Sequence, residues 1–117
     1  MEGYIKLHRS TLEWGWYDNI NTKVVFLHLL LTANFREREY HGVIVRAGDA
    51  VFGLQSLSEK LGLSVQQVRT ALKHLQSTGE ITIKSTNQFS VATLENWAKY
   101  QLSEDEATNE QQTSNNT

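Results

Sequence analysis

The chain has 117 residues, 39% of them hydrophobic and 21% charged, with a formal net charge of −2 at pH 7; this composition fits one globular domain and excludes an intrinsically disordered protein. It has no cysteine, so disulfides and thiol catalysis are excluded, and its four histidines lack the short spacings of a metal site. No apolar run approaches the ~20 residues of a membrane span, and the first residues lack the apolar core of a signal peptide, so we expect a cytoplasmic protein with neither a metal nor another cofactor.

The N-terminal region combines an extended segment with an aromatic cluster. Residues 4–8 (YIKLH) fit a short strand or an extended arm, and Ser10 is a candidate cap for a following helical turn. Trp14, Trp16 and Tyr17 are too large and too apolar to remain exposed together. We expect them to pack on the core, and a stacking or partner surface is the alternative.

A central helix is predicted over residues 22–35, after a turn. Asn21 precedes it as a candidate N-cap. Its sequence VVFLHLLLTA is apolar almost all round, so we expect the helix to be buried on most faces. His28 within it is more often a packed histidine than a ligand.

Residues 36–52 mix a charged segment with two short apolar runs. Residues 36–39 (RERE) alternate in sign, which favours a solvated loop, with phosphate contact by Arg36 or Arg38 as the alternative. Residues 43–45 and 50–52 flank a four-residue turn and are predicted to be extended. One of them is expected to pair with strands later in the chain.

Two serines, each followed three residues later by Glu or Gln, predict two helix starts eight residues apart. Ser56 with Glu59, and Ser64 with Gln67, fit a capping box, in which the serine oxygen and the later side chain satisfy free amides at a helix start. Gly62 lies between them and is suited to end the first helix. The pattern is therefore helix, tight turn, helix.

The second of these helices has one apolar and one polar face. Val65, Val68, Leu72 and Leu75 follow the spacing of one buried stripe. The outward side chains are donors and cations without an acid: Gln66, Gln67, Arg69, Thr70, Lys73, His74 and Gln76. Such a face suits a DNA groove, because Arg can bond guanine and Gln can bond adenine with two hydrogen bonds each. An ordinary solvated helix face is the alternative.

A β-hairpin is predicted after Gly79. Residues 80–84 and 89–92 alternate polar and apolar, and residues 85–88 supply the turn between them. The side chains expected to share the core face are Ile81, Ile83, Phe89 and Val91. The side chains expected at the tip are Lys84, Asn87 and Gln88.

The chain closes with a helical turn around Trp97 and Tyr100, which we expect to pack back on the domain. Residues 103–117 carry four acids and no base, which leaves residues 1–102 with 11 basic and 9 acidic side chains. We therefore expect one domain over residues 1–102 and a disordered acidic and polar tail or linker over residues 103–117.

The order of these elements is that of a winged helix-turn-helix. We expect an α+β, mainly α, fold in which about three core helices pack on a small antiparallel sheet whose hairpin is the wing. A capped helix start also favours a phosphate. The side chains expected to contact DNA are Ser64, Gln66, Gln67, Arg69, Thr70, Lys73, Lys84 and Asn87.

Three runs of the sequence carry a resemblance to a known family: YIKLHRSTLEWGWYDN, HLLLTANFREREYHGVIVRAGD and LSEKLGLSVQQVRTALKHLQSTGEITIKSTN. Together with ENWAKYQ they cover residues 4 to about 101 and resemble the N-terminal winged-helix domain of phage replisome organisers and DnaD-like primosome proteins. The resemblance implies a role in starting phage or plasmid DNA replication in a bacterial host: binding of double-stranded DNA, self-association as a homodimer, and recruitment of a helicase loader or another replication protein. Relatives of full length usually carry a second domain after the linker, so helicase loading is not carried over to this chain.

Two other functions remain open. Residues 63–81 also look like the reading helix of winged-helix transcription regulators, in which the position held by Arg69 commonly contacts DNA; this makes a phage or prophage regulator the alternative. A winged helix can also serve as a protein-interaction module. An enzyme is not expected, because the sequence has no Gly-rich phosphate loop, nucleophile elbow or H-E-x-x-H motif.

Overall fold

The computed structural model describes residues 3–102, which form an α+β structure, as the sequence predicts, with two small antiparallel sheets where one was expected. The elements in chain order are η1 (Arg9–Glu13, a 3-10 helix), α1 (Ile20–Thr32), β1 (Arg38–Tyr40), β2 (Val43–Val45), β3 (Asp49–Phe52), α2 (Leu54–Leu61), α3 (Val65–Ser77), β4 (Ile81–Ser85), β5 (Ser90–Leu94) and α4 (Trp97–Gln101). No helix within these residues is long and apolar enough to cross a membrane. The tail predicted over residues 103–117 lies outside the described residues.

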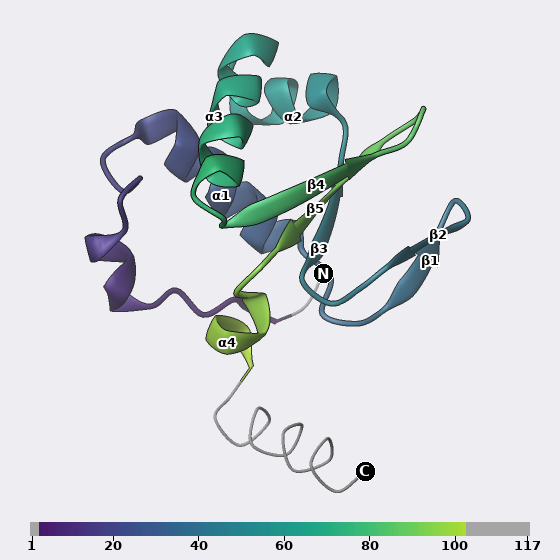
Figure 1. Ribbon diagram of the computed structural model, residues 1–117, viewed down its shortest axis with the longest axis horizontal. Coiled ribbons are helices and arrows are strands. Elements are labelled where there is room, and N and C mark those ends of the chain that lie inside the picture. The colour runs from purple at the N-terminus through teal and green to yellow at the C-terminus, as the bar shows by residue number, and fades with distance from the viewer. Residues whose placement is uncertain (1–2, 103–117) are drawn as a thin grey trace, which may run out of the picture.

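The larger sheet joins β3, β5 and β4 in that order, and Figure 1 shows the helices gathered around it. β3 pairs with β5, which confirms that one of the two early extended segments joins the hairpin strands. Directly paired residues of an antiparallel sheet lie on the same face. Ile81 pairs with Leu94 and Ile83 with Ala92, so these four side chains share the face that packs on the helices.

This register corrects the predicted core face. Val91 pairs with Lys84 and therefore lies on the opposite face from Ile81, while Phe89 precedes β5. The core positions belong to Ala92 and Leu94 instead. Ala92 pairs with Ala50, and both are fully buried where α1 contacts β3 and β5. Two small side chains at this point let the helix approach the sheet closely.

The central helix α1 begins two residues earlier than predicted and ends three residues earlier. Asn19, not Asn21, is the N-cap, and its side chain accepts a hydrogen bond from the Thr22 amide at 3.1 Å. The helix stops at Thr32 because Ala33 has an extended backbone, with φ −61° and ψ 141°. The core side chains on this helix are Val25, Leu29 and Leu30.

The start of α2 also differs from the prediction. The N-cap is Gly53, without a side-chain hydrogen bond, and Ser56 lies within the first turn. The predicted capping box of Ser56 with Glu59 is therefore wrong. Leu54 and Leu57 both pack on the core, so burial of these side chains, rather than a polar cap, accounts for where the helix starts.

The N-terminal aromatic residues are only partly as predicted. Trp14 and Trp16 are half-buried against the core, as expected, whereas Tyr17 is 38% exposed and lies under the Lys23 ammonium, 4.3 Å from the ring centroid. Ser10 lies inside η1 and does not cap it, because the N-cap position is occupied by His8.

Hydrogen bonds join the two ends of the described chain. Gln101 is 5% exposed; its Nε2 donates to the Lys6 carbonyl and its Oε1 accepts from the Lys6 amide, each at 2.7 Å. The His8 ring is hydrogen-bonded to the Tyr100 carbonyl at 2.7 Å. The segment through residues 6–8 is thus held against α4 by polar contacts 92 to 95 residues apart in sequence.

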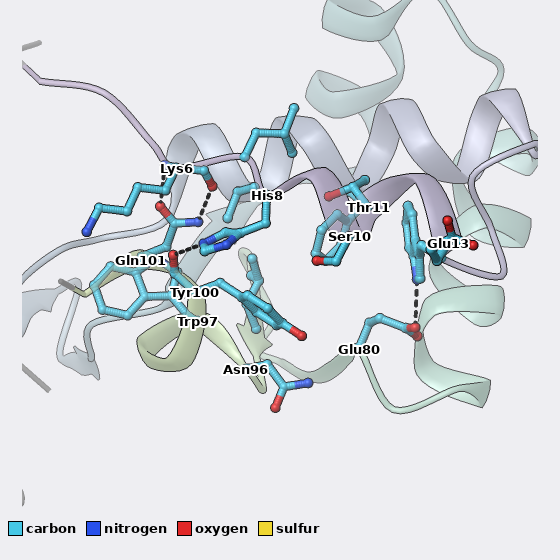
Figure 2. A pocket seen from close by; sticks show the side chains of 15 residues that line it. Lys6, His8, Ser10, Thr11, Glu13, Glu80, Asn96, Trp97, Tyr100 and Gln101 are labelled. Carbon is cyan, nitrogen blue, oxygen red and sulfur yellow. Dashed lines mark hydrogen bonds between the residues drawn. The ribbon is translucent and has the colours of Figure 1, made fainter. Parts of the chain in front are cut away.

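Figure 2 shows the cavity of about 300 Å³ that this N-terminal segment partly covers. At its other end the Trp14 indole donates to Glu80 Oε1 at 2.8 Å. Trp97 lines the cavity and is buried, as predicted, and a Cβ built on Gly48 would lie 3.0 Å from the Trp97 Cβ. Glycine is therefore required at position 48, where φ is +88°, for α4 to pack on this turn.

Residues 38–45 form a second hairpin that the sequence analysis missed. The charged segment predicted as a solvated loop supplies β1, and Tyr40 pairs with Val43 across a two-residue turn. Both turn residues, His41 and Gly42, have positive φ (48° and 80°), which a type I′ hairpin turn requires. Arg38 is consequently an exposed strand residue.

Candidate nucleic-acid interface

The start of α3 is fixed by a complete capping box. The Gln67 amide donates to Ser64 Oγ at 3.0 Å, and the Ser64 amide donates to Gln67 Oε1 at 2.8 Å. Just before it, Gly62 ends α2 in the left-handed conformation with φ 69°. The predicted tight turn between two helices is therefore confirmed at its second helix and at its glycine.

The phase of α3 follows the predicted stripe. Val68, Ala71, Leu72 and Leu75 are buried in the core, and Val65 is half-buried at the start of the helix. The exposed polar side chains of the same helix are Gln66, Gln67, Arg69, Thr70, Lys73, Gln76 and Ser77. Residues 65–77 contain no acid, so the exposed face of α3 carries positive charge from Arg69 and Lys73 alone.

Ser64 and Gln67, two of the residues predicted to contact DNA, already form hydrogen bonds within the protein. The capping box uses the Ser64 hydroxyl oxygen and the Gln67 amide oxygen, which leaves these atoms less free to accept bonds from a ligand. Gln66, Arg69, Thr70 and Lys73 remain, and within this group Gln66 Nε2 donates a long hydrogen bond of 3.5 Å to Thr70 Oγ1. These four side chains form what we call the α3 face.

His74 was predicted to face outward with this set, and the structure corrects that expectation. Its ring stacks on Trp16, with centroids 4.3 Å apart and planes at 11°, and its Nδ1 is hydrogen-bonded to Thr22 Oγ1 at 2.9 Å. Trp16 also donates to Thr78 Oγ1 at 2.8 Å. His74 therefore connects α3 to α1 and to the segment before α1 instead of joining the α3 face.

The other two residues predicted to contact DNA, Lys84 and Asn87, lie on the β4–β5 hairpin. Lys84 is exposed near the end of β4, and Asn87 is exposed in the turn. The turn is ordered by Thr86, whose Oγ1 accepts from the Gln88 and Phe89 amides at 3.2 and 3.1 Å. Figure 1 shows the hairpin leaving the lower end of α3 and projecting past α2, with its tip directed away from α3.

The β1–β2 hairpin lies beside this tip. The Tyr40 ring meets the Phe89 ring edge-on at 5.1 Å between centroids, and His41 lies 6.3 Å from Phe89. The signal that identifies this hairpin in the sequence is the His41–Gly42 pair between two short runs with strand-forming residues.

A cavity of about 270 Å³ separates the two hairpins from α2. Its lining includes polar side chains from four elements or turns, namely His28, Tyr40, Ser56, Lys60 and Gln88. Burial, followed by repulsion from Lys60, lowers the pKa of His28 below its ordinary value of 6.5.

No group of three or more His, Cys, Asp or Glu side chains within the part of the chain that the structure describes could hold a metal ion. No known protein family, curated protein or solved structure matches this chain.

Proposed function

We propose that this chain binds duplex DNA through the α3 face, with the β4–β5 hairpin as the wing of a winged helix-turn-helix. The observation that carries the proposal is the capped helix α3, which exposes the four polar side chains of the α3 face and no acid. A helix of this kind fits the major groove, which is about 12 Å wide. The predicted net positive charge of residues 1–102 acts in the same direction.

The side chains differ in what they offer DNA. Arg69 lies in the second turn of α3, where its planar guanidinium can form two hydrogen bonds to guanine. Gln66, one turn earlier, can bond adenine in the same way. Lys84 lies on the hairpin as a flexible point charge suited to a phosphate. Base contacts are thus assigned to α3 and backbone contacts to the hairpin.

The process that the proposal assigns is initiation of phage or plasmid DNA replication, supported by the resemblance of the three sequence runs to replisome organisers and DnaD-like proteins. A helicase loader or another replication protein is the proposed protein partner. A phage or prophage transcription regulator would use the same helix. Mobility shifts with random duplex and with the DNA upstream of the coding sequence separate these roles from non-specific binding, since an origin binder or a regulator retains one fragment selectively.

Two single substitutions test the assigned contacts. Arg69→Ala should remove roughly 1–3 kcal/mol of binding free energy and relax preference at one base pair. Lys84→Ala should weaken binding to all sequences alike. It should also reduce by about one the number of phosphates that the salt dependence of the affinity reports. Affinities are measured by fluorescence anisotropy against a panel of duplexes with single base-pair changes.

Lys99→Ala is the matched control, because Lys99 is an exposed cation on α4, away from α3. It removes the same charge and should leave affinity nearly unchanged. If a folded Arg69→Ala variant binds its preferred duplex as tightly as the parent, α3 does not enter the groove. The protein-interaction module then becomes the better interpretation of this fold.

A further inference from the structure

The cavity of about 300 Å³ that the N-terminal segment partly covers has a lining that the α3 face does not share. Its apolar side chains come from the residues before α1 and from α1, β5 and α4: Leu7, Trp14, Phe26, Leu30, Leu94 and Trp97. Small-molecule sites have a lining of this kind, to which a few polar groups are added that orient the ligand. We call this space the Glu80 cavity, after the acid that lines it at one end (Figure 2).

Glu80 brings a negative charge to this cavity. The residue is half-buried; its Oε1 accepts a hydrogen bond from the Trp14 indole at 2.8 Å, and its Oε2 accepts one from the Thr78 hydroxyl. Both donors are neutral, so they orient the carboxylate without neutralising its charge. A charged group that is partly removed from water is stabilised by an opposite charge beside it. The Glu80 carboxylate therefore favours a cation in the cavity that it lines.

The other charged side chains of the lining agree with this preference. Glu13 is a second acid, and Figure 2 shows it at the same end of the cavity as Glu80. Lys6 lies at the opposite end, with its ammonium group directed away from the other lining residues. His8 lies beside Lys6, hydrogen-bonded to the Tyr100 carbonyl at 2.7 Å. Negative charge is thus concentrated at the Glu80 end.

Aromatic rings of the lining also favour a cation. The rings of Trp14 and Phe26 lie 4.9 Å apart between centroids, and Trp97 and Tyr100 line the same cavity. The faces of such rings attract organic cations, those of Trp most strongly, and they also pack well on a flat apolar body. Figure 2 shows the Ser10 and Tyr100 hydroxyl groups between the two ends, where they can orient a bound molecule.

We propose that the Glu80 cavity binds a small organic cation, with an aromatic or apolar body among the rings and its positive group on the Glu80 carboxylate. Residues 6–8 and α4 both line the cavity and are hydrogen-bonded to each other, so the ligand contacts both ends of the described chain. Its binding should therefore stabilise the fold. Binding at this site does not depend on DNA, since the α3 face does not line the cavity.

Three molecules of the same shape and different charge test the ligand class: benzamidine is a cation, benzamide is neutral and benzoate is an anion. Isothermal titration calorimetry of the full chain should give a benzamidine dissociation constant of about 1 mM or lower. Benzamide and benzoate should bind at least about tenfold more weakly, because only the cation forms a charge-assisted hydrogen bond with Glu80. Absence of benzamidine binding, or equal binding of the three molecules, overturns the proposal.

NMR of the labelled chain locates the bound molecule. The indole Nε1–H signals of Trp14 and Trp97 should shift as benzamidine is added, because both rings line the cavity. The backbone amide signal of Arg69, on α3, should stay in place. Shifts confined to residues outside the lining would show that benzamidine binds elsewhere and would overturn the assigned site.

Glu80→Gln removes the charge and keeps an oxygen that can accept from Trp14. It should raise the benzamidine dissociation constant by about tenfold and leave that of benzamide unchanged. Glu95→Gln is the matched control, because Glu95 is an exposed acid whose amide donates to the Glu80 carbonyl but whose side chain does not line the cavity. It should bind benzamidine like the parent. A folded Glu80→Gln variant that binds benzamidine as tightly as the parent contradicts the proposal.

Ser10→Phe tests the site independently of the acid. Ser10 is exposed on η1 and lines the cavity, so a phenyl ring at this position should occupy the space and abolish benzamidine binding. Circular dichroism confirms that each variant is folded. Should the folded Ser10→Phe variant bind benzamidine with the affinity of the parent, the ligand does not enter the Glu80 cavity.

Discussion

Ser64 and Gln67 satisfy each other's backbone amides at the first turn of α3, with hydrogen bonds of 3.0 and 2.8 Å. The same two residues were predicted to contact DNA. A side-chain oxygen that accepts a hydrogen bond at a helix start is less available to a ligand, so the structure favours a stabilising role for Ser64 and Gln67. The contacts with bases are then left to Gln66, Arg69 and Thr70.

Removal of the Ser64 hydroxyl should destabilise the fold. Ser64→Ala is expected to lower the free energy of unfolding by about 0.5–2 kcal/mol, because the Gln67 amide loses its acceptor. Urea unfolding followed by circular dichroism measures the change. Ser56→Ala is the matched control, since Ser56 is exposed within α2 and caps nothing. An equal loss in both variants would contradict the assignment of the cap.

His28 makes the stability of the fold depend on pH. Burial and repulsion from Lys60 lower the pKa of His28 in the folded protein. At a pH between this lowered pKa and 6.5, the unfolded chain therefore binds more protons than the folded protein does. The contribution of His28 to stability is therefore full above pH 6.5 and decreases as the pH falls through this window.

The melting temperature of the parent should consequently fall between pH 7 and pH 5 by more than that of His28→Gln, which retains a polar side chain but cannot be protonated. The same decrease in both proteins would show that other groups cause it. Thermal unfolding in matched buffers at constant ionic strength is sufficient for this comparison.

At the scale of elements, α3 is stabilised mainly by its apolar stripe. Leu72 is 5% exposed in the middle of that stripe, so Leu72→Ala should cost about 2–5 kcal/mol through lost burial and the cavity that remains. Chemical denaturation measures the difference. Gln66→Ala, on the exposed side of the same helix, should change stability by less than about 0.5 kcal/mol. A near-neutral Leu72→Ala would mean that α3 is rotated from the phase described.

Local chemistry explains which elements were predictable. The serine-glutamine pair and Gly62 located the α2–α3 turn because capping and left-handed glycine act within a few residues. The start of α2 was not predictable from capping, because burial of Leu54 and Leu57 places it. Alternation of polar and apolar residues also could not give the register of β5. Val91 and Ala92 are both apolar, so a period of two does not show which of them faces the core. Only the pairing of Ala92 with Ala50 under α1 explains why the smaller residue faces the core.

At the scale of the whole molecule, the contacts that the sequence did not reveal are those between distant segments. Gln101 is hydrogen-bonded to the backbone of Lys6, 95 positions away in sequence. Trp16 stacks on His74, 58 positions away. The second contact removes His74 from the α3 side chains that were predicted to face outward. Helix periodicity placed Arg69 and Lys73 on the exposed side, but the direction of the hairpin tip away from α3 required the fold.

The central proposal is that Arg69 and Lys73 on α3, together with Lys84 on the β4–β5 hairpin, bind the charged backbone and grooves of duplex DNA. With Arg69 on a base, Lys73 and Lys84 would neutralise about two phosphates, so affinity should fall roughly 12-fold between 50 and 200 mM salt. The measurement is the anisotropy of a labelled duplex titrated with the parent and with the Arg69→Ala, Lys73→Ala double variant. The proposal predicts the steep salt dependence for the parent, and weaker binding with a shallower dependence for the folded double variant. Salt-independent binding, or equal affinity and salt dependence in the two proteins, would contradict it.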